Sequence, residues 1–266
     1  MAFAKSIVVY TALFGKNTGL VEQKNFKGID FICYTDRDDI KSKTWKVIKV
    51  KRPVENDAVR SNRWYKINPH LHLPEQYDQS IYIDANILVL QDLKKKVNLW
   101  LKDKIMVHFD HNLTVHDPRD CAYAECEAII EIGENTGIFK DDPAVMKPQM
   151  ERFKNEGYPQ NNGLIFASVL IRKHKDADVI NLMNSWWDTV LNQSKRDQLS
   201  FNYHVWKLGL EDKIKVLPGD LREGNPWVYM IRHRNDFRWK VFRTRLKNSL
   251  GLLKLKNRLP QDFDNV

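Results

Sequence analysis

The sequence has few cysteines and no long uncharged run, and these absences exclude several classes of protein. Its three cysteines, Cys33, Cys121 and Cys126, form neither a disulfide framework nor a metal-binding pattern. The longest uncharged stretches, 6–15 and 161–171, span 10 and 11 residues, whereas a membrane-spanning helix needs about 20. The first residues lack the apolar run and the cleavage site of a secretion signal. We therefore expect a cytoplasmic protein with reduced thiols and no spanning helix.

Several nucleotide-binding and hydrolytic motifs are missing as well. The sequence contains neither Gly-x-Gly-x-x-Gly nor a Walker-type loop, which disfavours kinases and dinucleotide-dependent oxidoreductases. It also lacks a Gly-x-Ser-x-Gly elbow, which weakens a hydrolase interpretation.

Positive charge is concentrated in one segment. The 266 residues include 43 bases and 34 acids, a formal charge of +9, and ten bases with one acid lie between Arg232 and Arg258. The other 239 residues balance at 33 bases and 33 acids. This distribution disfavours a nucleic-acid coat protein, and no reader motif occurs, so we expect no nucleic-acid partner. We expect a folded domain over residues 1–231 and a basic amphipathic segment over residues 232–266.

Short apolar runs alternate with helical patterns along the chain. The pattern predicts buried strands over residues 6–14, 30–35 and 80–90, and helices over residues 57–68 and 177–192. Strands that alternate with helices indicate an α/β fold with a mostly parallel sheet covered on both faces. Ligands bind such sheets at the carboxyl ends of the strands.

Asp84, Ala85 and Asn86 interrupt the apolar run over residues 80–90. A carboxylate in an apolar run is costly to bury unless it meets a cation, a metal or hydrogen-bond donors. Two polar side chains at a strand end can face one ligand, and oxygen atoms suit Mg²⁺ or Mn²⁺ bridging a diphosphate. An aspartate that only caps a turn explains the tripeptide equally simply.

Two further segments carry candidate residues. Arg60, Arg63 and Lys66 recur at three-residue spacing, which predicts cations along one side of a helix, paired with phosphates or facing solvent. Asp197 and the adjacent Gln198 stand at a predicted helix start. There they could bind sugar hydroxyls, assist proton transfer or cap the helix.

Several segments of the chain, taken in order, resemble those of a known family. The segments are VVYTALFGK (8–16), DFICYTD (30–36), RSNRWYKINPH (60–70), SIYIDANI (80–87), RDCAYAECEA (119–128), NNGLIFASVLIRKH (161–174) and RDQLSF (196–201). Over roughly residues 5–220 the chain resembles the glycosyltransferase-like domain family of plant Golgi proteins of mucilage and pectin synthesis, which has relatives in bacterial polysaccharide gene sets. The resemblance implies a GT-A-like fold, in which a Rossmann-type sheet binds a nucleotide-sugar, usually with a divalent cation.

The resemblance also implies roles for individual residues. Asp84 and Asn86 match an Asp-x-Asp motif that binds the ribose and a metal-bridged diphosphate, and His233 is the candidate third metal ligand. The implied donor-binding residues are Thr11, Ala12, Asp36, Arg60, Arg63, Lys66, Asp84, Ala85, Asn86, Asn162 and Gly163. The implied catalytic residues are Asp197, Gln198 and Glu125. In an inverting enzyme, Asp197 or Glu125 would deprotonate the acceptor hydroxyl.

The predicted function is therefore transfer of a sugar from a nucleotide-sugar to a glycan acceptor. We expect a UDP-sugar donor, Mn²⁺ or Mg²⁺ as cofactor, and a glycan or lipid-linked glycan acceptor in capsule- or lipopolysaccharide-type synthesis. The alternative is a GT-A-like module that binds a nucleotide-sugar or glycan without turnover. Asn86 favours this alternative, because an amide is a weaker metal ligand than a carboxylate.

Apolar residues recur at helical spacing within the basic segment. They are Trp239, Phe242, Leu246, Leu250 and Leu253. With cations largely between them, the pattern over residues 232–258 is typical of a basic amphipathic helix on an anionic membrane surface. The alternative is a helix that packs on its own domain or on a second protomer, which leaves a homo-oligomer open. The predicted location is cytoplasmic, with a peripheral position on the inner face of the membrane as the further expectation.

Overall fold

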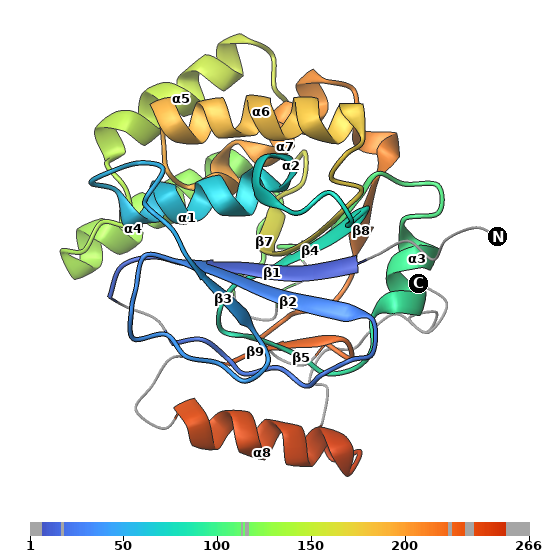
Figure 1. Cartoon of the computed structure of the whole chain (residues 1–266). Coiled ribbons are helices and arrows are strands. Elements are labelled where there is room, and N and C mark those ends of the chain that lie inside the picture. Colours follow the sequence, from blue (N-terminus) through green and yellow to red (C-terminus); the bar gives the residue numbers. More distant parts are fainter. Residues whose placement is uncertain are drawn as a thin grey trace.

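A seven-stranded sheet separates two layers of the molecule (Figure 1). The computed structural model describes residues 7–16, 19–112, 114, 117–222, 225–231 and 237–253. The strand order is β3-β2-β1-β4-β7-β6-β8. The strands are β1 (Ile7–Leu13), β2 (Ile29–Thr35), β3 (Lys46–Lys49), β4 (Gln79–Ile83), β6 (Met106–Asp110), β7 (Ile165–Arg172) and β8 (Ile214–Leu217). Only β7 runs antiparallel to its neighbours in this sheet, so the predicted α/β fold with a mostly parallel sheet is confirmed.

Most helices lie on one face of the sheet, and a small second sheet with the helix over residues 94–100 covers the other (Figure 1). The second sheet pairs β5 (Ile87–Val89) with β9 (Val228–Met230). The helices are α1 (Ala58–Ile67), α2 (Pro69–His72), α3 (Lys94–Trp100), α4 (Ala122–Thr136), α5 (Pro143–Asn155), α6 (Ala177–Asn192), α7 (Phe201–Lys207) and α8 (Phe237–Ser249), with 3-10 turns η1 (Asp197–Leu199) and η2 (Glu211–Lys213). In the part of the chain that the structure describes, no helix is both long and apolar enough to cross a bilayer.

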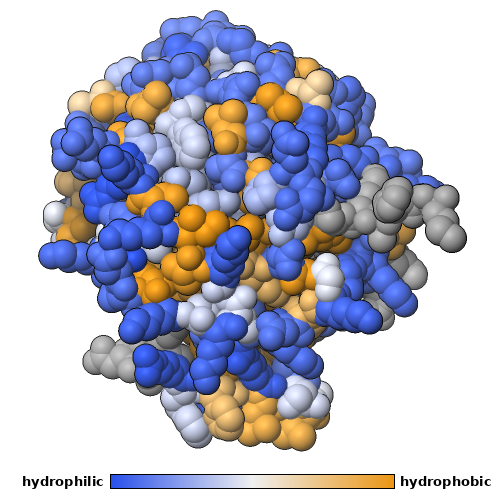
Figure 2. All heavy atoms as spheres, viewed as in Figure 1, coloured by the Kyte–Doolittle hydropathy of each residue, from blue (hydrophilic) through white to orange (hydrophobic). Residues whose placement is uncertain are grey.

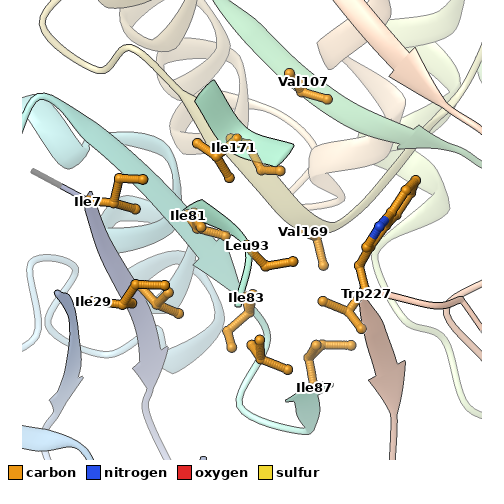
Figure 3. Close-up of a cluster of buried hydrophobic side chains, with 14 of the residues drawn as sticks. Ile7, Ile29, Ile81, Ile83, Ile87, Leu93, Val107, Val169, Ile171 and Trp227 are labelled. Carbon is orange, nitrogen blue, oxygen red and sulfur yellow. The ribbon is translucent and has the colours of Figure 1, made fainter. Parts of the chain in front are cut away.

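Side chains that alternate along the strands supply two separate cores. Along β1, Tyr10 and Ala12 pack toward α1 and α6, whereas Val9 and Leu13 pack toward the second sheet. Figure 3 shows the core between the two sheets, in which Ile81 and other side chains of the main sheet meet Ile87 and Trp227. Burial on both faces explains why the central strands are near-continuous apolar runs.

Aspartates fix where three of the helices start. Asp57 accepts a hydrogen bond from the Arg60 amide (2.8 Å) and begins α1. Asp142 and Asp176 cap α5 and α6 in the same way. Each cap satisfies a backbone donor that lacks a partner within its helix. The cap at Asp57 sets where α1 starts, and therefore which of its residues reach the end of β1.

The expectation of one strand over residues 80–90 is wrong. The Ile87 amide donates to the Asp84 carbonyl (2.9 Å), which closes a turn between β4 and β5. β5 then leaves the main sheet and pairs with β9. β9 itself was not predicted, because its three residues carry no period that distinguishes them from a loop. The turn ends β4 at Ile83 and places Asp84 at the carboxyl edge of the sheet.

Replacing Ile81 with alanine tests the core beneath the sheet. Ile81 is fully buried, and its truncation should lower the free energy of unfolding by about 2–5 kcal/mol because the cavity cannot fully collapse. Urea unfolding followed by circular dichroism measures the change. Ile138→Ala is the control, because Ile138 is 74% exposed and should change stability by less than about 0.5 kcal/mol. Equal effects of the two substitutions would contradict the assigned core.

Candidate active site

A cavity of about 600 Å³ opens at the carboxyl ends of β1 and β4, beside the first turns of α1. Its lining combines the loop after β1, one side of α1 and the β4–β5 turn. The lining residues are Ala12, Phe14, Gly15, Lys16, Ala58, Val59, Asn62, Arg63, Asp84, Ala85 and Asn86. Ligands of open α/β sheets bind at this edge. The cavity is therefore the candidate active site.

Asp84 lies at the end of β4 and is held from two directions. Its backbone amide donates to the Ser168 carbonyl on β7 (2.9 Å). The Tyr82 hydroxyl donates to the Asp84 Oδ1 atom (2.9 Å). Burial, with Asp84 as a smaller cause, raises the pKa of Tyr82 well above its usual value, so Tyr82 keeps the proton that it donates. Tyr82 thus fixes the orientation of the carboxylate at the rim of the cavity.

Asn86 connects the cavity to the second sheet. Its Nδ2 atom donates to the Ile231 carbonyl (3.2 Å), and the Ile231 amide donates to the Asn86 carbonyl (2.8 Å). One N–H of the Asn86 side-chain amide is thereby used, and the side-chain oxygen Oδ1 is the atom that this amide can offer to a cation. His233, the predicted third metal ligand, lies outside the described residues. Among the residues that are described, no group of three His, Cys, Asp or Glu side chains could hold a metal ion.

Behind the cavity, one buried carboxylate pairs with two cations. Asp197 Oδ2 lies 3.1 Å from Arg63 Nε and forms a hydrogen-bonded ion pair with Lys66 Nζ. Asp197 and Lys66 are each only 2% exposed. The contact joins η1 to α1, although the two elements are 131 residues apart at Lys66 and Asp197. Arg63 also lines the cavity, so this ion-pair cluster extends from the core to the site.

The charges of this cluster depend on one another. Burial alone would raise the pKa of Asp197, but Arg63 and Lys66 outweigh it and hold the pKa well below its usual range. Burial lowers the pKa of Lys66, and Asp197 opposes that change. Burial likewise acts to lower the pKa of Arg63, but Asp197 and Asp84 raise it above its usual value. Arg63 therefore stays positive between one carboxylate in the core and one at the cavity rim.

Arg60 does not reach the cavity, although it shares the three-residue spacing of Arg63 and Lys66. Its guanidinium donates to the Val190 and Gln193 carbonyls (2.9 and 2.7 Å) at the end of α6. Three residues fall short of a 3.6-residue turn, so side chains six residues apart differ in direction by about 120°. The structure thus brings Arg63 and Lys66 together and turns Arg60 toward α6.

The predicted nucleoside positions differ in their surroundings. Ala12 lines the cavity, whereas Thr11 is fully buried and is not among the lining residues. Asp36 accepts from the Gly15 amide (3.2 Å) and pairs with Arg52 (2.6 Å), so it supports the loop after β1. Gly15 has a φ of +75°, which favours glycine at the point where this loop turns.

Glu125 and Gln198 both contact Arg196, the residue before Asp197, and neither contacts Arg63 in the described structure. Glu125 is buried and pairs with Arg119 (2.5 Å), and its other oxygen lies 3.5 Å from Arg196. Gln198 accepts from Arg196 (3.0 Å) and donates to a carbonyl of β7 (3.0 Å). Neither side chain is part of the cavity lining. Their catalytic roles stay predictions.

Asn162 and Gly163 form a turn that leads into β7. Gly163 has a φ of +79°, and a Cβ atom there would lie 3.0 Å from the Asn202 side chain. Asn202 accepts from the Ile165 amide (2.9 Å) and donates to the Asn162 carbonyl (3.4 Å). The turn is therefore fixed by the helix that follows the RDQLSF segment, and its role in binding a sugar stays a prediction.

Three residues that the sequence did not single out contribute to the site. Lys16 lines the cavity from the loop after β1. Asn62 lines the cavity and donates to the Ala12 carbonyl (2.6 Å), which ties α1 to the end of β1. Tyr82 orients Asp84. All three lie within segments that resemble the family, VVYTALFGK, RSNRWYKINPH and SIYIDANI, and this was the available signal.

Residues 4–220 match the family described as "TOD1/MUCI70, glycosyltransferase-like domain". The chain belongs to the TOD1/MUCI70 glycosyltransferase-like family. The match covers most of the chain, and the resemblance inferred from the sequence is confirmed. No curated protein matches the chain significantly.

Several solved glycosyltransferases are distant structural neighbours of this TOD1/MUCI70 domain. The apo bifunctional glycosyltransferase WbbM aligns with a TM-score of 0.45 and 10% identity, over 95% of this chain and 45% of that one. GlyE of Streptococcus pneumoniae TIGR4 gives 0.37 and 10%, over 80% and 45%. Apo mouse xyloside xylosyltransferase 1 gives 0.39 and 10%, over 80% and 84%. The chain thus spans less than half of the first two chains, and such likenesses do not carry over a donor or an acceptor.

Replacing Asp197 with asparagine tests the buried ion-pair cluster. The substitution leaves Lys66 and Arg63 without a counter-charge and should lower the free energy of unfolding by about 3–5 kcal/mol. Because the pKa of Asp197 is depressed in the folded protein, its carboxylate contributes fully to the free energy of unfolding above the ordinary carboxyl pKa of about 3.9. This contribution is lost as the pH falls toward the pKa of Asp197 in the folded protein. The difference from wild type should therefore be full at neutral pH and narrow below about pH 3.9.

Urea unfolding over a pH series measures both effects. Asp178→Asn is the matched control, because Asp178 forms an exposed ion pair with Lys213 (2.5 Å) and should cost less than about 1 kcal/mol. If the two substitutions cost the same at neutral pH, the buried cluster does not stabilise the fold as described.

Proposed function

We propose that this TOD1/MUCI70 domain transfers a sugar from a nucleotide-sugar donor to a glycan acceptor. One observation carries the proposal: Asp84 and Arg63 line the same cavity at the carboxyl ends of the central strands. A carboxylate that can bind ribose or a metal, next to a fixed cation, suits a nucleoside diphosphate. Membership of a glycosyltransferase-like family supports the reaction class.

The chemical problem in this reaction is the leaving group. Breaking the sugar–phosphate bond builds negative charge on the nucleoside diphosphate, and preorganised cations stabilise that charge. Arg63 is the fixed cation of the cavity, with Lys66 behind it on the same helix. Lys16 also lines the cavity from the loop after β1. We propose that Arg63 and Lys16 contact the diphosphate directly.

Two oxygen-bearing side chains at the cavity rim support the proposal of a divalent cation. Asp84 offers a carboxylate, and Asn86 offers its amide oxygen because its Nδ2 atom is bonded to the Ile231 carbonyl. Mg²⁺ in such sites binds one or two carboxylates and takes its other ligands from phosphates and water. We propose that Asp84 and Asn86 hold Mn²⁺ or Mg²⁺, with His233 as third ligand. The bound cation would supply positive charge to the diphosphate.

Asp197 is proposed as a positioning residue. Its carboxylate is buried and paired with Arg63 and Lys66, and its depressed pKa makes it a weak proton acceptor. It fixes Arg63 at the cavity, so it acts on the substrate through that cation. Glu125 is the remaining candidate base, and its pairing with Arg119 would have to open for that role.

The proposal also names a class of donor and a class of acceptor. We propose a UDP-sugar as donor and a glycan or lipid-linked glycan of a surface polysaccharide as acceptor, in the cytoplasm. A second candidate is a module that binds nucleotide-sugar without turnover. Asn86 favours it, because this position lacks a second carboxylate.

Substitutions at the cavity test turnover. Asp84→Asn and Arg63→Gln should each lower the rate of UDP-sugar hydrolysis by at least about 100-fold. Arg63 would stabilise the developing negative charge directly, and Asp84 would hold the cation that does so. A scan of UDP-sugars with Mn²⁺, followed by detection of released UDP, measures the rate. Asp103→Asn and Arg152→Gln are matched controls outside the cavity and should retain the wild-type rate. Wild-type rates for both cavity variants would refute the site, and binding without any turnover would establish the second candidate.

A thermal-shift assay tests donor and cation binding without activity. UDP at about 100 times its Kd adds about 2.7 kcal/mol, which raises the Tm by roughly 5–10 °C for a chain of this size. We expect this rise with Mn²⁺ and a smaller one with EDTA. Asp84→Asn should remove the part that depends on Mn²⁺, and Arg63→Gln should weaken binding under both conditions. If no nucleotide or nucleotide-sugar changes the Tm, the donor site is wrongly assigned.

A further inference from the structure

Helix α8 contacts the rest of the protein through one face. In Figure 1 it lies below β5 and β9, on the side of the sheet away from α1 and α6. Val241 packs with Leu88 and Ile231, and Asn248 Nδ2 donates to the Leu90 carbonyl (3.1 Å). The buried or half-buried positions of this inner face are Val241, Thr244, Arg245 and Asn248. Val241 is the only aliphatic residue among them.

Most of the predicted apolar stripe of α8 points away from the protein. Four of its five residues are exposed, Trp239 (61%), Phe242 (55%), Leu246 (47%) and Leu250 (61%), and Leu253 is half-buried. At about 100° per residue, these four side chains fall within an arc of about 80°, on the side opposite the inner face. The rings of Trp239 and Phe242 stack with centroids 5.5 Å apart. Figure 2 shows apolar surface at the lowest part of the molecule, where α8 lies in Figure 1.

This orientation is opposite to that of a helix that packs only on its own domain. A surface helix normally turns its apolar stripe toward the core and its charged side toward water. In α8 the stripe faces outward, although Val241 is buried and the helix is held at two further points. A contiguous exposed apolar patch marks a surface that another structure covers.

Cations flank the outward stripe on both sides. Arg238 lies along one edge, and Arg243 and Lys247 lie along the other, and all three are exposed. An acidic side chain is absent from α8. The segment from Arg232 to Arg258 carries ten bases and one acid, whereas the rest of the chain is neutral. The partner of this face therefore combines an apolar phase with negative charge.

We propose that α8 docks this protein on a lipid bilayer that carries anionic headgroups, with Trp239, Phe242, Leu246 and Leu250 in the acyl boundary. Arg238, Arg243 and Lys247 then lie at the level of the headgroups. Helices with Trp, Phe and Leu on one face and Lys or Arg beside them bind membranes in this manner. Each cation near such a surface contributes to binding, and the apolar stripe anchors the helix in its plane.

A second copy of the chain fits this face less well. Two α8 helices that bury their stripes against each other would bring Arg238, Arg243 and Lys247 of both copies together, and no acid of α8 could compensate them. Like charges that meet across an interface cost affinity. An anionic bilayer has no such repulsion. The charge of α8 thus favours lipid over self-association.

Co-sedimentation of the full chain with vesicles tests the proposal. We expect binding to phosphatidylcholine vesicles that contain phosphatidylglycerol, and weak binding to phosphatidylcholine alone. Arg243→Gln/Lys247→Gln should weaken binding to the anionic vesicles by about tenfold or more. Phe242→Ser/Leu246→Ser should weaken it by at least a similar factor because the anchor is lost. Salt at about 1 M, where the Debye length is about 3 Å, should release the wild type in part.

Matched controls lie on the opposite side of the molecule, in and before α5. Lys147→Gln/Lys154→Gln removes the same number of exposed cations, and Ile138→Ser/Val145→Ser removes exposed apolar side chains. Both should bind vesicles as wild type does. Circular dichroism and urea unfolding show whether each variant folds.

Two results would overturn the proposal. One is vesicle binding that both α8 variants retain. The other is a wild-type chain that sediments as a dimer without binding vesicles, and that Phe242→Ser/Leu246→Ser converts to a monomer. The second result would assign the stripe to a second copy of the chain.

Discussion

The ion pair that Lys66 and Arg63 share with Asp197 joins parts of the chain that are far apart in sequence. Asp197 belongs to η1, and both cations belong to α1, which runs beside the end of β1. Because the carboxylate is buried, its charge is stable only with both cations in place, and the cations are stable only with the carboxylate. The position of Arg63 in the cavity therefore depends on residues outside the cavity. The fold and the candidate site share one electrostatic constraint.

The β4–β5 turn supplies the second constraint and links the site to α8. The turn exposes Asp84 at the edge of the main sheet and sends β5 to pair with β9. Ile231, which follows β9, bonds to Asn86 on the cavity rim and packs against Val241 of α8. A surface that holds α8 would therefore also hold this rim, through the few residues between them. If α8 lies on a bilayer, Ile231 would join the cavity rim to the helix that is held there.

The sequence predicted the fold class and the main helices because apolar period and capping aspartates are local signals. It also singled out Asp84, although within a predicted strand and not after the end of one. It did not predict that β4 ends at Ile83, because residues 87–89 are as apolar as β4. These residues differ from β4 in their pairing partner, which is β9 and not a strand of the main sheet. It could not separate Arg60 from Arg63, since equal spacing hides a rotation of about 60° per step. Nor could it show that Asp197 is buried against Lys66, which is a contact across 131 residues.

Asn86 affects the formal charge of the cavity as well as the number of carboxylates that could bind a metal. Arg63 and Lys66 carry two positive charges, and Asp197 and Asp84 carry two negative charges, so these four groups sum to zero. Lys16 also lines the cavity and brings the formal charge of the site to +1, so a second carboxylate at position 86 would reduce it to zero. With asparagine there, Lys16 and any bound cation would act on a diphosphate itself and would not first have to offset a further carboxylate. A neutral amide at this position would thus weaken one bond to a metal but lower the repulsion that phosphates meet.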